Sequence, residues 1–287
     1  MKQPQENDKK RWIENFAAWM DARNLTNDTK THYLYCAKHF LNSCSSFPPT
    51  KDDVVNFISS KKGKRVVYWS VIKRLFKVNG YSVMSEHDME MYKPKLSEHP
   101  PNRPYFETVE QVFQFLDGAR TDWLKLAILI AAETGARRKQ ITLMMRDDFN
   151  QEERTLRIPP VKRGVERFEV LSARTAKLLK DYLESRKDDD PHLIVNSRGK
   201  PLTVMLMTIA FINLKKRLGI YLKGLSWHSF RRSYATWLYQ HGLKELEIMQ
   251  AGGWKSLNMV AAYTRLKPSE TILKAAKIHP MKKERWS

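Results

Sequence analysis

Two residues that could bind a phosphate occur together in the segment WHSFRRSYATWLYQHG. His228 and Arg231 stand three residues apart, so they lie on one face of an expected helix, close to its start. Backbone N–H groups at a helix start lack partners within the helix and also favour anions. This spacing is a weak indication by itself, because most such pairs are ordinary surface residues. It indicates a phosphate site only if other segments supply further groups.

Three other segments carry residues that could complete such a site. Arg137 follows a helix-breaking glycine in TGARRKQI, and Lys162 stands in VKRG at the tip of an expected β-hairpin. Trp254 and Tyr263 follow a turn in AGGWKSLNMVAAYTR. Taken alone, Tyr263 is better explained as a core aromatic residue, since Met259 stands four residues before it on the same helix face. The functional hypothesis therefore depends on the whole set.

As a set, these segments resemble the motifs of the tyrosine recombinases, also called phage integrases. TGARRKQI is similar to T-G-x-R-x-x-E-[LI], and HSFRRSYAT is similar to H-x-L-R-H-T-F-A-T. AGGWKSLNMVAAYTR is similar to L-G-H-x-S-x-x-T-T-x-x-Y-x-H, and VKRG falls where the family keeps a lysine on a hairpin. The resemblance covers nearly the whole chain. It implies six catalytic residues, which are Arg137, Lys162, His228, Arg231, Trp254 and Tyr263.

The sequence departs from the family pattern at a few positions. Gln140 stands where glutamate is usual, and Trp254 replaces the commoner histidine. Indole and imidazole N–H groups can both donate to a phosphate oxygen, so we expect Trp254 to preserve that contact. We expect Gln140 to support Arg137 and not to contact DNA. The other departures are basic residues where the family commonly has different side chains: Arg138, Lys139 and Arg232.

The residue types fit cleavage of a phosphodiester by a tyrosine. In-line attack gathers negative charge on the non-bridging oxygens, and guanidinium groups such as Arg137 and Arg231 meet these oxygens with paired hydrogen bonds. A phenol with an ordinary pKa near ~10 must lose its proton during the attack, and His228 can accept that proton or donate a hydrogen bond. The resemblance implies that Tyr263 then carries a 3′-phosphotyrosyl link while a 5′-hydroxyl departs.

The departing 5′ oxygen needs a proton, so the reaction requires a general acid. Lys162 is the candidate general acid, and Arg163 is the alternative.

The expected reaction needs no energy source. Because the phosphotyrosyl link conserves the energy of the phosphodiester, rejoining needs no ATP, and the sequence has no Walker-type loop. Two acidic runs, Asp147–Asp148 and Asp188–Asp190, are expected at a helix end and in a solvated loop and not as metal ligands. We therefore expect no cofactor, neither ATP nor a metal.

The composition indicates a polyanionic partner. Lys and Arg total 51 against 31 Asp and Glu, for a net charge of +20 and a pI near 9.9. Cys36 and Cys44 stand in no metal-ligand spacing and are expected to be reduced thiols. The sequence contains no signal-peptide core and no apolar run of membrane-spanning length. We expect double-stranded DNA as the partner, no membrane, and a cytoplasmic location, on the nucleoid if the source is prokaryotic.

The elements that position these residues are predicted to form two domains, and the predicted fold is mainly α with a small β-sheet or hairpin. Residues 1–91 contain four amphipathic helical stretches, which predict a helical core-binding domain that contacts DNA. Residues 92–104 include four prolines and predict a linker. Residues 105–287 are the expected catalytic domain, with a β-hairpin over 154–171. The resemblance implies that the two domains form a C-shaped clamp. Helices are predicted over 173–185, 204–217, 229–240, 244–250, 257–263 and, at the C-terminus, 268–277.

The fourth helix of the first domain and its N-terminal approach are strongly basic. A phosphate-contacting surface and a merely solvated helix face explain this pattern about equally well, and the net charge favours the first. With the hairpin tip, the residues expected to contact DNA are Lys62, Lys64, Arg65, Lys73, Arg74, Lys77 and Arg163.

The resemblance implies site-specific recombination, meaning integration, excision or resolution, by a homotetramer on two DNA sites that is a monomer or dimer off DNA. One alternative is a type IB topoisomerase, which shares the chemistry but needs no partner site. Another is a non-catalytic DNA-binding protein on the same scaffold. The target sequence and the choice between integrase and resolvase cannot be read from one chain. Whether the C-terminal helix docks on its own domain or on a neighbour also stays open.

Overall fold

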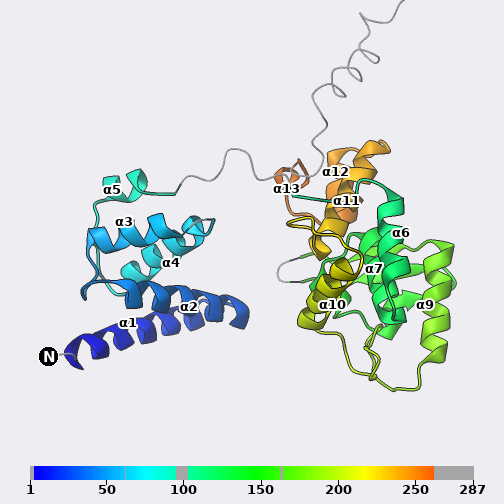
Figure 1. Ribbon diagram of the computed structural model, residues 1–287, viewed down its shortest axis with the longest axis horizontal. Helices are drawn as coiled ribbons and strands as arrows, with labels where there is room; N and C mark the ends of the chain where they lie inside the picture. The colour runs from blue at the N-terminus through cyan, green and yellow to red at the C-terminus, as the bar shows by residue number, and fades with distance from the viewer. Residues whose placement is uncertain (1–2, 62, 95–102, 162–163, 262–287) are drawn as a thin grey trace, which may run out of the picture. The chain divides into compact units, whose positions relative to one another are not determined.

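The computed structural model describes residues 3–61, 63–94, 103–161 and 164–261. Its contacts divide the chain into two compact units, residues 1–102 and 103–287, and the division falls inside the predicted linker. Figure 1 shows helices α1 to α5 in the N-terminal unit and the remaining elements in the C-terminal unit. Several predicted features lie outside the described residues: Lys62, Lys162, Arg163, Tyr263 and the helix over 268–277.

The N-terminal unit is built from the four predicted helices and one short additional helix. They are α1 (Gln3–Ala22), α2 (Asn27–Ser43), α3 (Lys51–Ser60), α4 (Arg65–Val78) and α5 (Glu86–Met91). Thr50 and Asp53 form a reciprocal capping box that starts α3. Phe16 and Phe40 are fully buried in the core of this unit, and burial of such a side chain stabilises it by about 2–3 kcal/mol.

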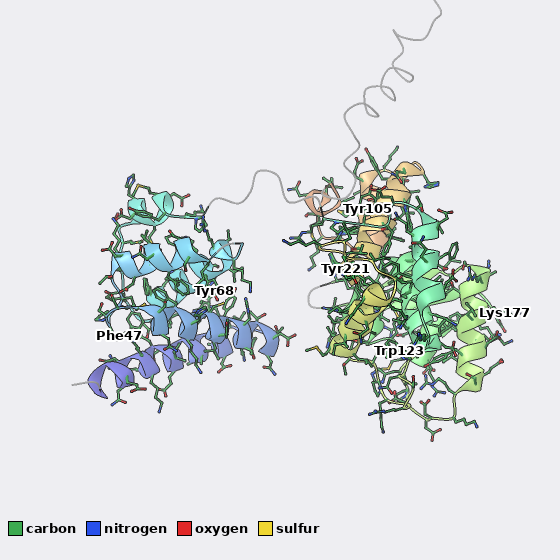
Figure 2. The ribbon with its side chains drawn as sticks, viewed as in Figure 1. Phe47, Tyr68, Tyr105, Trp123, Lys177 and Tyr221 are labelled. Carbon is green, nitrogen blue, oxygen red and sulfur yellow. The ribbon has the colours of Figure 1, made fainter. Side chains whose placement is uncertain are left out.

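Aromatic contacts extend this core toward the start of α4. Tyr68, labelled in Figure 2, is 4% exposed, and its hydroxyl lies 2.9 Å from Nδ1 of His39. Burial raises the pKa of the Tyr68 hydroxyl. The two cysteines are free thiols, as expected, and burial raises the pKa of Cys44 to about 12.

The C-terminal unit is organised around α7 (Asp122–Thr134). Every residue from 126 to 132 in this helix is buried, as expected of a helix that is apolar on all sides. It packs against α6 (Val109–Gly118), α9 (Ala173–Ser185) and α11 (Trp227–Gln240). The other helices of the unit are α8 (Arg138–Ile141), the 3-10 helix η1 (Arg146–Asp148), α10 (Val204–Arg217), α12 (Glu245–Gly252) and α13 (Leu257–Ala261).

The predicted hairpin is part of a three-stranded antiparallel sheet. Its strands are β1 (Phe149–Asn150), β2 (Thr155–Ile158) and β3 (Arg167–Val170), in the order β1-β2-β3. Leu156 and Ile158 are fully buried, as the alternation of β2 predicts. Strand β3 differs, because Phe168 and Val170 are each 65% exposed and its charged residues face inward.

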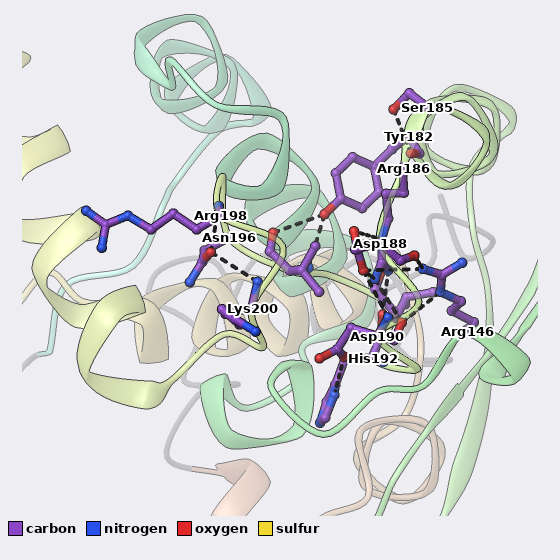
Figure 3. Close-up of polar contacts among 12 residues, drawn as sticks. Arg146, Tyr182, Ser185, Arg186, Asp188, Asp190, His192, Asn196, Arg198 and Lys200 are labelled. Atoms are coloured by element: carbon purple, nitrogen blue, oxygen red, sulfur yellow. Dashed lines mark hydrogen bonds and ion pairs between the residues drawn. The ribbon is translucent and has the colours of Figure 1, made fainter.

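The acidic run Asp188–Asp190 lies in a loop after α9, as expected, and Asp189 is exposed, but Asp188 and Asp190 are half-buried and bonded and not freely solvated. Figure 3 shows two of its carboxylates within a polar cluster after α9. Arg186 donates to Asp188, while Asp190 contacts the His192 ring at 2.7 Å. The hydrogen bond from Arg186 lowers the pKa of Asp188 to about 2. The cluster also includes Arg146, which bonds to the Asp188 and Asp190 carbonyl oxygens at 2.6 and 2.9 Å.

None of the helices within the described residues is both long enough and apolar enough to cross a membrane.

Candidate active site

Arg137 is placed by the turn that ends α7. Gly135 adopts a left-handed conformation with φ 61°, and a Cβ at this position would lie 2.7 Å from the Tyr234 ring. The Thr134 hydroxyl accepts from the backbone N–H of Ala136 at 3.1 Å. The chain therefore leaves α7 in one direction, and Arg137 becomes the half-buried residue that precedes α8.

Gln140 supports Arg137, as expected from the sequence. It is 3% exposed, and its Oε1 accepts from the backbone N–H of Arg137 at 2.9 Å. Its Nε2 donates to the carbonyl oxygen of Pro159 at 2.8 Å, just beyond β2. The amide thus uses a donor and an acceptor at once, which an ionised glutamate could not do.

His228 and Arg231 both lie in the first turns of α11 but have different surroundings. His228 is exposed, whereas Arg231 is 1% exposed. Arg231 donates from Nη1 to the carbonyl oxygen of Gly135 at 2.7 Å and from Nη2 to that of Gly252 at 2.6 Å. It therefore connects the turn before Arg137 with the turn at the end of α12.

This burial bears on the predicted phosphate contact of Arg231. A phosphate would have to reach a side chain of which almost none is exposed, so in this conformation Arg231 acts through the backbone that it holds. Direct contact with a scissile phosphate remains a prediction, and it requires the side chain to become accessible when DNA binds.

Trp254 is folded against Arg231 by the two preceding glycines. Gly253 is left-handed with φ 61°, and a Cβ on Gly252 would lie 1.6 Å from the Trp254 ring. The ring is 5% exposed, and its centre lies 3.8 Å from the Arg231 guanidinium carbon, a cation–π contact. Because the ring is buried against Arg231, the expected contact between Trp254 and a phosphate is still a prediction.

His228 and Arg137 line one open surface pocket. The pocket has a volume of about 280 Å³, and its other lining residues are Arg138, Lys139, Val204, Ser226 and Trp227. Three of the seven lining residues carry a positive charge, so the pocket favours an anion.

The same surroundings change the protonation of His228. Although the residue is exposed by area, the protein around its ring lowers the pKa to about 4, and Arg232, Arg231, Arg137 and Arg103 act in the same direction. His228 is therefore neutral at pH 7 and has one nitrogen that can accept a proton. This state suits a group that takes the proton of an attacking phenol.

The structure brings four of the six predicted catalytic residues to neighbouring turns: Arg137, His228, Arg231 and Trp254. Tyr263 and Lys162 lie outside the described residues, and their roles stay predictions.

Two further arginines hold this region together, and motif comparison did not assign either of them a role. Arg232 donates to the carbonyl oxygen of Pro104 from Nε and Nη2, at 2.9 and 2.6 Å, and so fixes the chain that enters the unit. Arg167 on β3 is 9% exposed and bonds to the ends of α7 and α12. No sequence feature indicated the second contact, because the alternation of β3 predicts that Phe168 and Val170 face inward and that Arg167 faces outward.

The basic residues predicted to contact DNA in the N-terminal unit lie on or beside α4. Lys64, Arg65, Lys73 and Lys77 are exposed. Arg74 is half-buried and donates to the carbonyl oxygen of Ser70 at 2.8 Å. Their contact with DNA is untested, and it stays a prediction.

Comparison with known proteins identifies the family. The model of the "Phage integrase family" matches residues 103–270, more than half of the chain. The chain therefore belongs to the phage integrase family of tyrosine recombinases, which confirms the resemblance seen in the sequence.

Individual relatives agree with this assignment along most of the chain. Tyrosine recombinase XerA of Pyrococcus furiosus is 26% identical over 265 residues, which cover 88% of this chain and 89% of the relative. Tyrosine recombinase XerC of Rickettsia bellii is 26% identical over 290 residues, with 91% and 93% covered.

Solved structures share the fold. The Tn1549 transposon integrase in complex with circular intermediate DNA matches with a TM-score of 0.74 at 16% identity, covering 93% of this chain and 99% of that one. A lambda integrase dimer bound to a COC′ core site matches with a TM-score of 0.72 at 17% identity, covering 89% and 77%. The mainly helical fold with a small sheet is thus confirmed as that of the tyrosine recombinases.

Proposed function

We propose that this protein is a site-specific recombinase that cleaves and rejoins double-stranded DNA through a 3′-phosphotyrosyl intermediate on Tyr263. The observation that carries the proposal is the Arg231 bridge. One buried guanidinium bonds to the carbonyl oxygens of Gly135 and Gly252 and so holds together the turns that lead to Arg137 and Trp254. The bridge brings these two turns to the start of α11, where His228 lies.

The proposed chemistry assigns one role to each group at the phosphate. Arg137, with Arg231 once it becomes accessible, neutralises charge on the non-bridging oxygens. Neutral His228 accepts the Tyr263 proton as the phenolic oxygen attacks phosphorus, and the P–O5′ bond breaks. Lys162 protonates the departing 5′ oxygen. Rejoining reverses these steps and releases Tyr263.

No ATP and no metal ion take part in the proposed reaction. The phosphotyrosyl link retains the energy of the phosphodiester, so rejoining needs no added driving force. Guanidinium groups neutralise the charge on the phosphate, a role that a metal ion has in metal-dependent nucleases.

The proposed assembly is a homotetramer that joins two DNA sites, formed from monomers or dimers that bind single sites. The Tn1549 integrase that shares this fold is in complex with circular intermediate DNA, and the lambda integrase is a dimer bound to a core site. The excess of 51 basic over 31 acidic residues suits wrapping of a duplex. The role would be integration, excision or resolution, performed in the cytoplasm.

A plasmid with two sites tests the function. The sites come from DNA fragments that the purified protein selects from a random-sequence pool, and they are cloned as direct repeats. We expect the intervening segment to be deleted without ATP and in the presence of EDTA. Relaxation of a supercoiled plasmid that lacks these sites would instead indicate topoisomerase activity. Binding without deletion or a covalent adduct would contradict the proposal.

A further inference from the structure

Strand β3 turns its charged side chains into the protein. Arg167 is 9% exposed and the Glu169 side chain 14% exposed, whereas Phe168 and Val170 are each 65% exposed. A buried charge is costly unless it is paired and hydrogen-bonded. Specific contacts must therefore stabilise this register of the strand.

Arg167 makes these contacts at the ends of two helices. Its Nη2 donates to the carbonyl oxygen of Thr134, the last residue of α7, and its Nη1 donates to that of Ala251 in α12 at 2.9 Å. Arg167 also pairs with Glu169, whose carboxylate accepts from the Tyr234 hydroxyl at 3.0 Å. One guanidinium thus joins the sheet to two helices that are distant in sequence.

The contacts of Arg167 run parallel to those of Arg231. Arg167 bonds to the carbonyls of residues 134 and 251, and Arg231 bonds to those of residues 135 and 252. The same two turns are therefore held at consecutive residues by two separate cations. One turn leads to Arg137, and the other leads to Trp254.

The charge of Arg167 persists at neutral pH. Burial lowers its pKa to about 10, and the nearby charge of Arg137 acts in the same direction. The protonated guanidinium keeps its planar set of donors, which a lysine cannot reproduce with a single ammonium group.

We propose that Arg167 is a positioning residue for strand cleavage, which sets the separation between the turn carrying Arg137 and the turn carrying Trp254. It acts through backbone carbonyls and does not touch DNA. This inference rests on the proposed function, because the reaction that it serves is cleavage at Tyr263.

Arg167→Lys in the full-length chain tests the proposal, because lysine keeps a positive charge beside Glu169 and limits the damage to folding. Arg157→Lys is the matched control. Arg157 lies on the neighbouring strand β2 and, like Arg167, is ion-paired, in its case with Asp148 and Glu166. No described contact joins it to either turn.

The readout is single-turnover formation of the covalent adduct on a nicked suicide substrate, at saturating DNA and at a temperature where each variant is folded. Arg167→Lys is expected to slow the rate constant about tenfold or more, with DNA affinity nearly unchanged, because misplaced groups lose transition-state stabilisation. Arg157→Lys should stay within about twofold of the wild type. Equal rates for Arg167→Lys and wild type would overturn the inference.

A second substrate separates positioning from a general weakening of the fold. In a scissile methylphosphonate a methyl group replaces one non-bridging oxygen, so the attack needs less neutralising charge. The ratio of wild-type to Arg167→Lys rates is expected to fall from about tenfold toward about twofold on this substrate. An unchanged ratio would overturn the positioning role. If the wild type forms no adduct on the phosphodiester, the proposed function fails, and the inference fails with it.

Discussion

The guanidinium carbon of Arg231 lies 3.8 Å from the centre of the Trp254 ring. The ring covers a cation that is itself bonded to the backbone on both sides of the site, so the positions of the two residues depend on each other. A desolvated cation–π contact of this kind contributes about 2 kcal/mol. Disturbing the ring should therefore disturb Arg231 beneath it.

Gly252→Ala is the most direct way to displace this ring. The added Cβ would lie 1.6 Å from the Trp254 ring, so the ring must leave its place above Arg231. We expect a loss of about 1–3 kcal/mol in the free energy of unfolding, measured with urea, and a large fall in the rate of adduct formation. Gly219→Ala is the control for steric contact, because its added Cβ meets no atom within 4 Å, although Gly219, unlike Gly252, has a positive φ. Normal cleavage by Gly252→Ala would contradict the role given to the ring.

Gln140→Glu introduces the residue that is usual in the family, and we expect it to be harmful here. A carboxylate accepts from the Arg137 N–H but cannot donate to the Pro159 oxygen, so a bond between two segments is lost, at a cost of about 1–3 kcal/mol. Burial should raise the pKa of the new carboxyl group above its unfolded value.

The sign of the pH effect follows from that raised pKa. The stability of the Gln140→Glu variant relative to wild type should be greatest below the unfolded pKa near ~4.3, and it should fall as pH rises through the folded pKa. Urea unfolding between acidic and neutral pH measures this difference. A difference that does not vary with pH would contradict the raised pKa of the new carboxyl group.

His228 should make the DNA-free protein less stable in acid. Its pKa is lowered from 6.5 to about 4, so the unfolded chain binds a proton more readily than the folded one between these values. Its contribution to stability is complete above about pH 6.5 and is lost as pH falls toward about 4. His228→Gln should unfold with a shallower dependence on pH in this window. Equal slopes for the variant and the wild type would contradict the shift.

Lys162 can be tested without knowing where its side chain lies. If it is the general acid, Lys162→Ala should cut a phosphodiester about 10²–10⁴ times more slowly than the wild type. A substrate with sulfur in place of the bridging 5′ oxygen should restore most of the rate, since a thiolate leaves without a proton. Rescue of Arg163→Ala, but not of Lys162→Ala, would assign the role to Arg163.

Local patterns predicted the helices well and the polar contacts poorly. The bounds expected for residues 173–185 and 204–217 match α9 and α10, where Ser172 and Thr203 accept bonds from the first-turn backbone. Helix α5 was missed because six residues are too few to show a helical period. A helix can be predicted from the sequence when the residues that start and stabilise it lie within it or directly beside it.

The contacts of the buried arginines could not be predicted from the neighbouring sequence. The sequence motifs predict that Arg231 binds a phosphate but could not show that it is buried, since its partners Gly135 and Gly252 are 96 and 21 residues away along the chain. The inward direction of Arg167 depends on the carbonyl oxygens of Thr134 and Ala251 in the same way. Asp188 was expected to be solvated, but in the folded chain it forms ion pairs with Arg146 and Arg186.

The central claim is that Tyr263 forms a covalent bond with DNA. The most direct test incubates the purified chain with a nicked suicide substrate that carries a selected site, and then separates protein–DNA adducts under denaturing conditions. The wild type should give an adduct that protease digestion reduces to a DNA-linked peptide containing Tyr263, and Tyr263→Phe should give none while still binding the site. An adduct of equal yield from Tyr263→Phe would contradict the account.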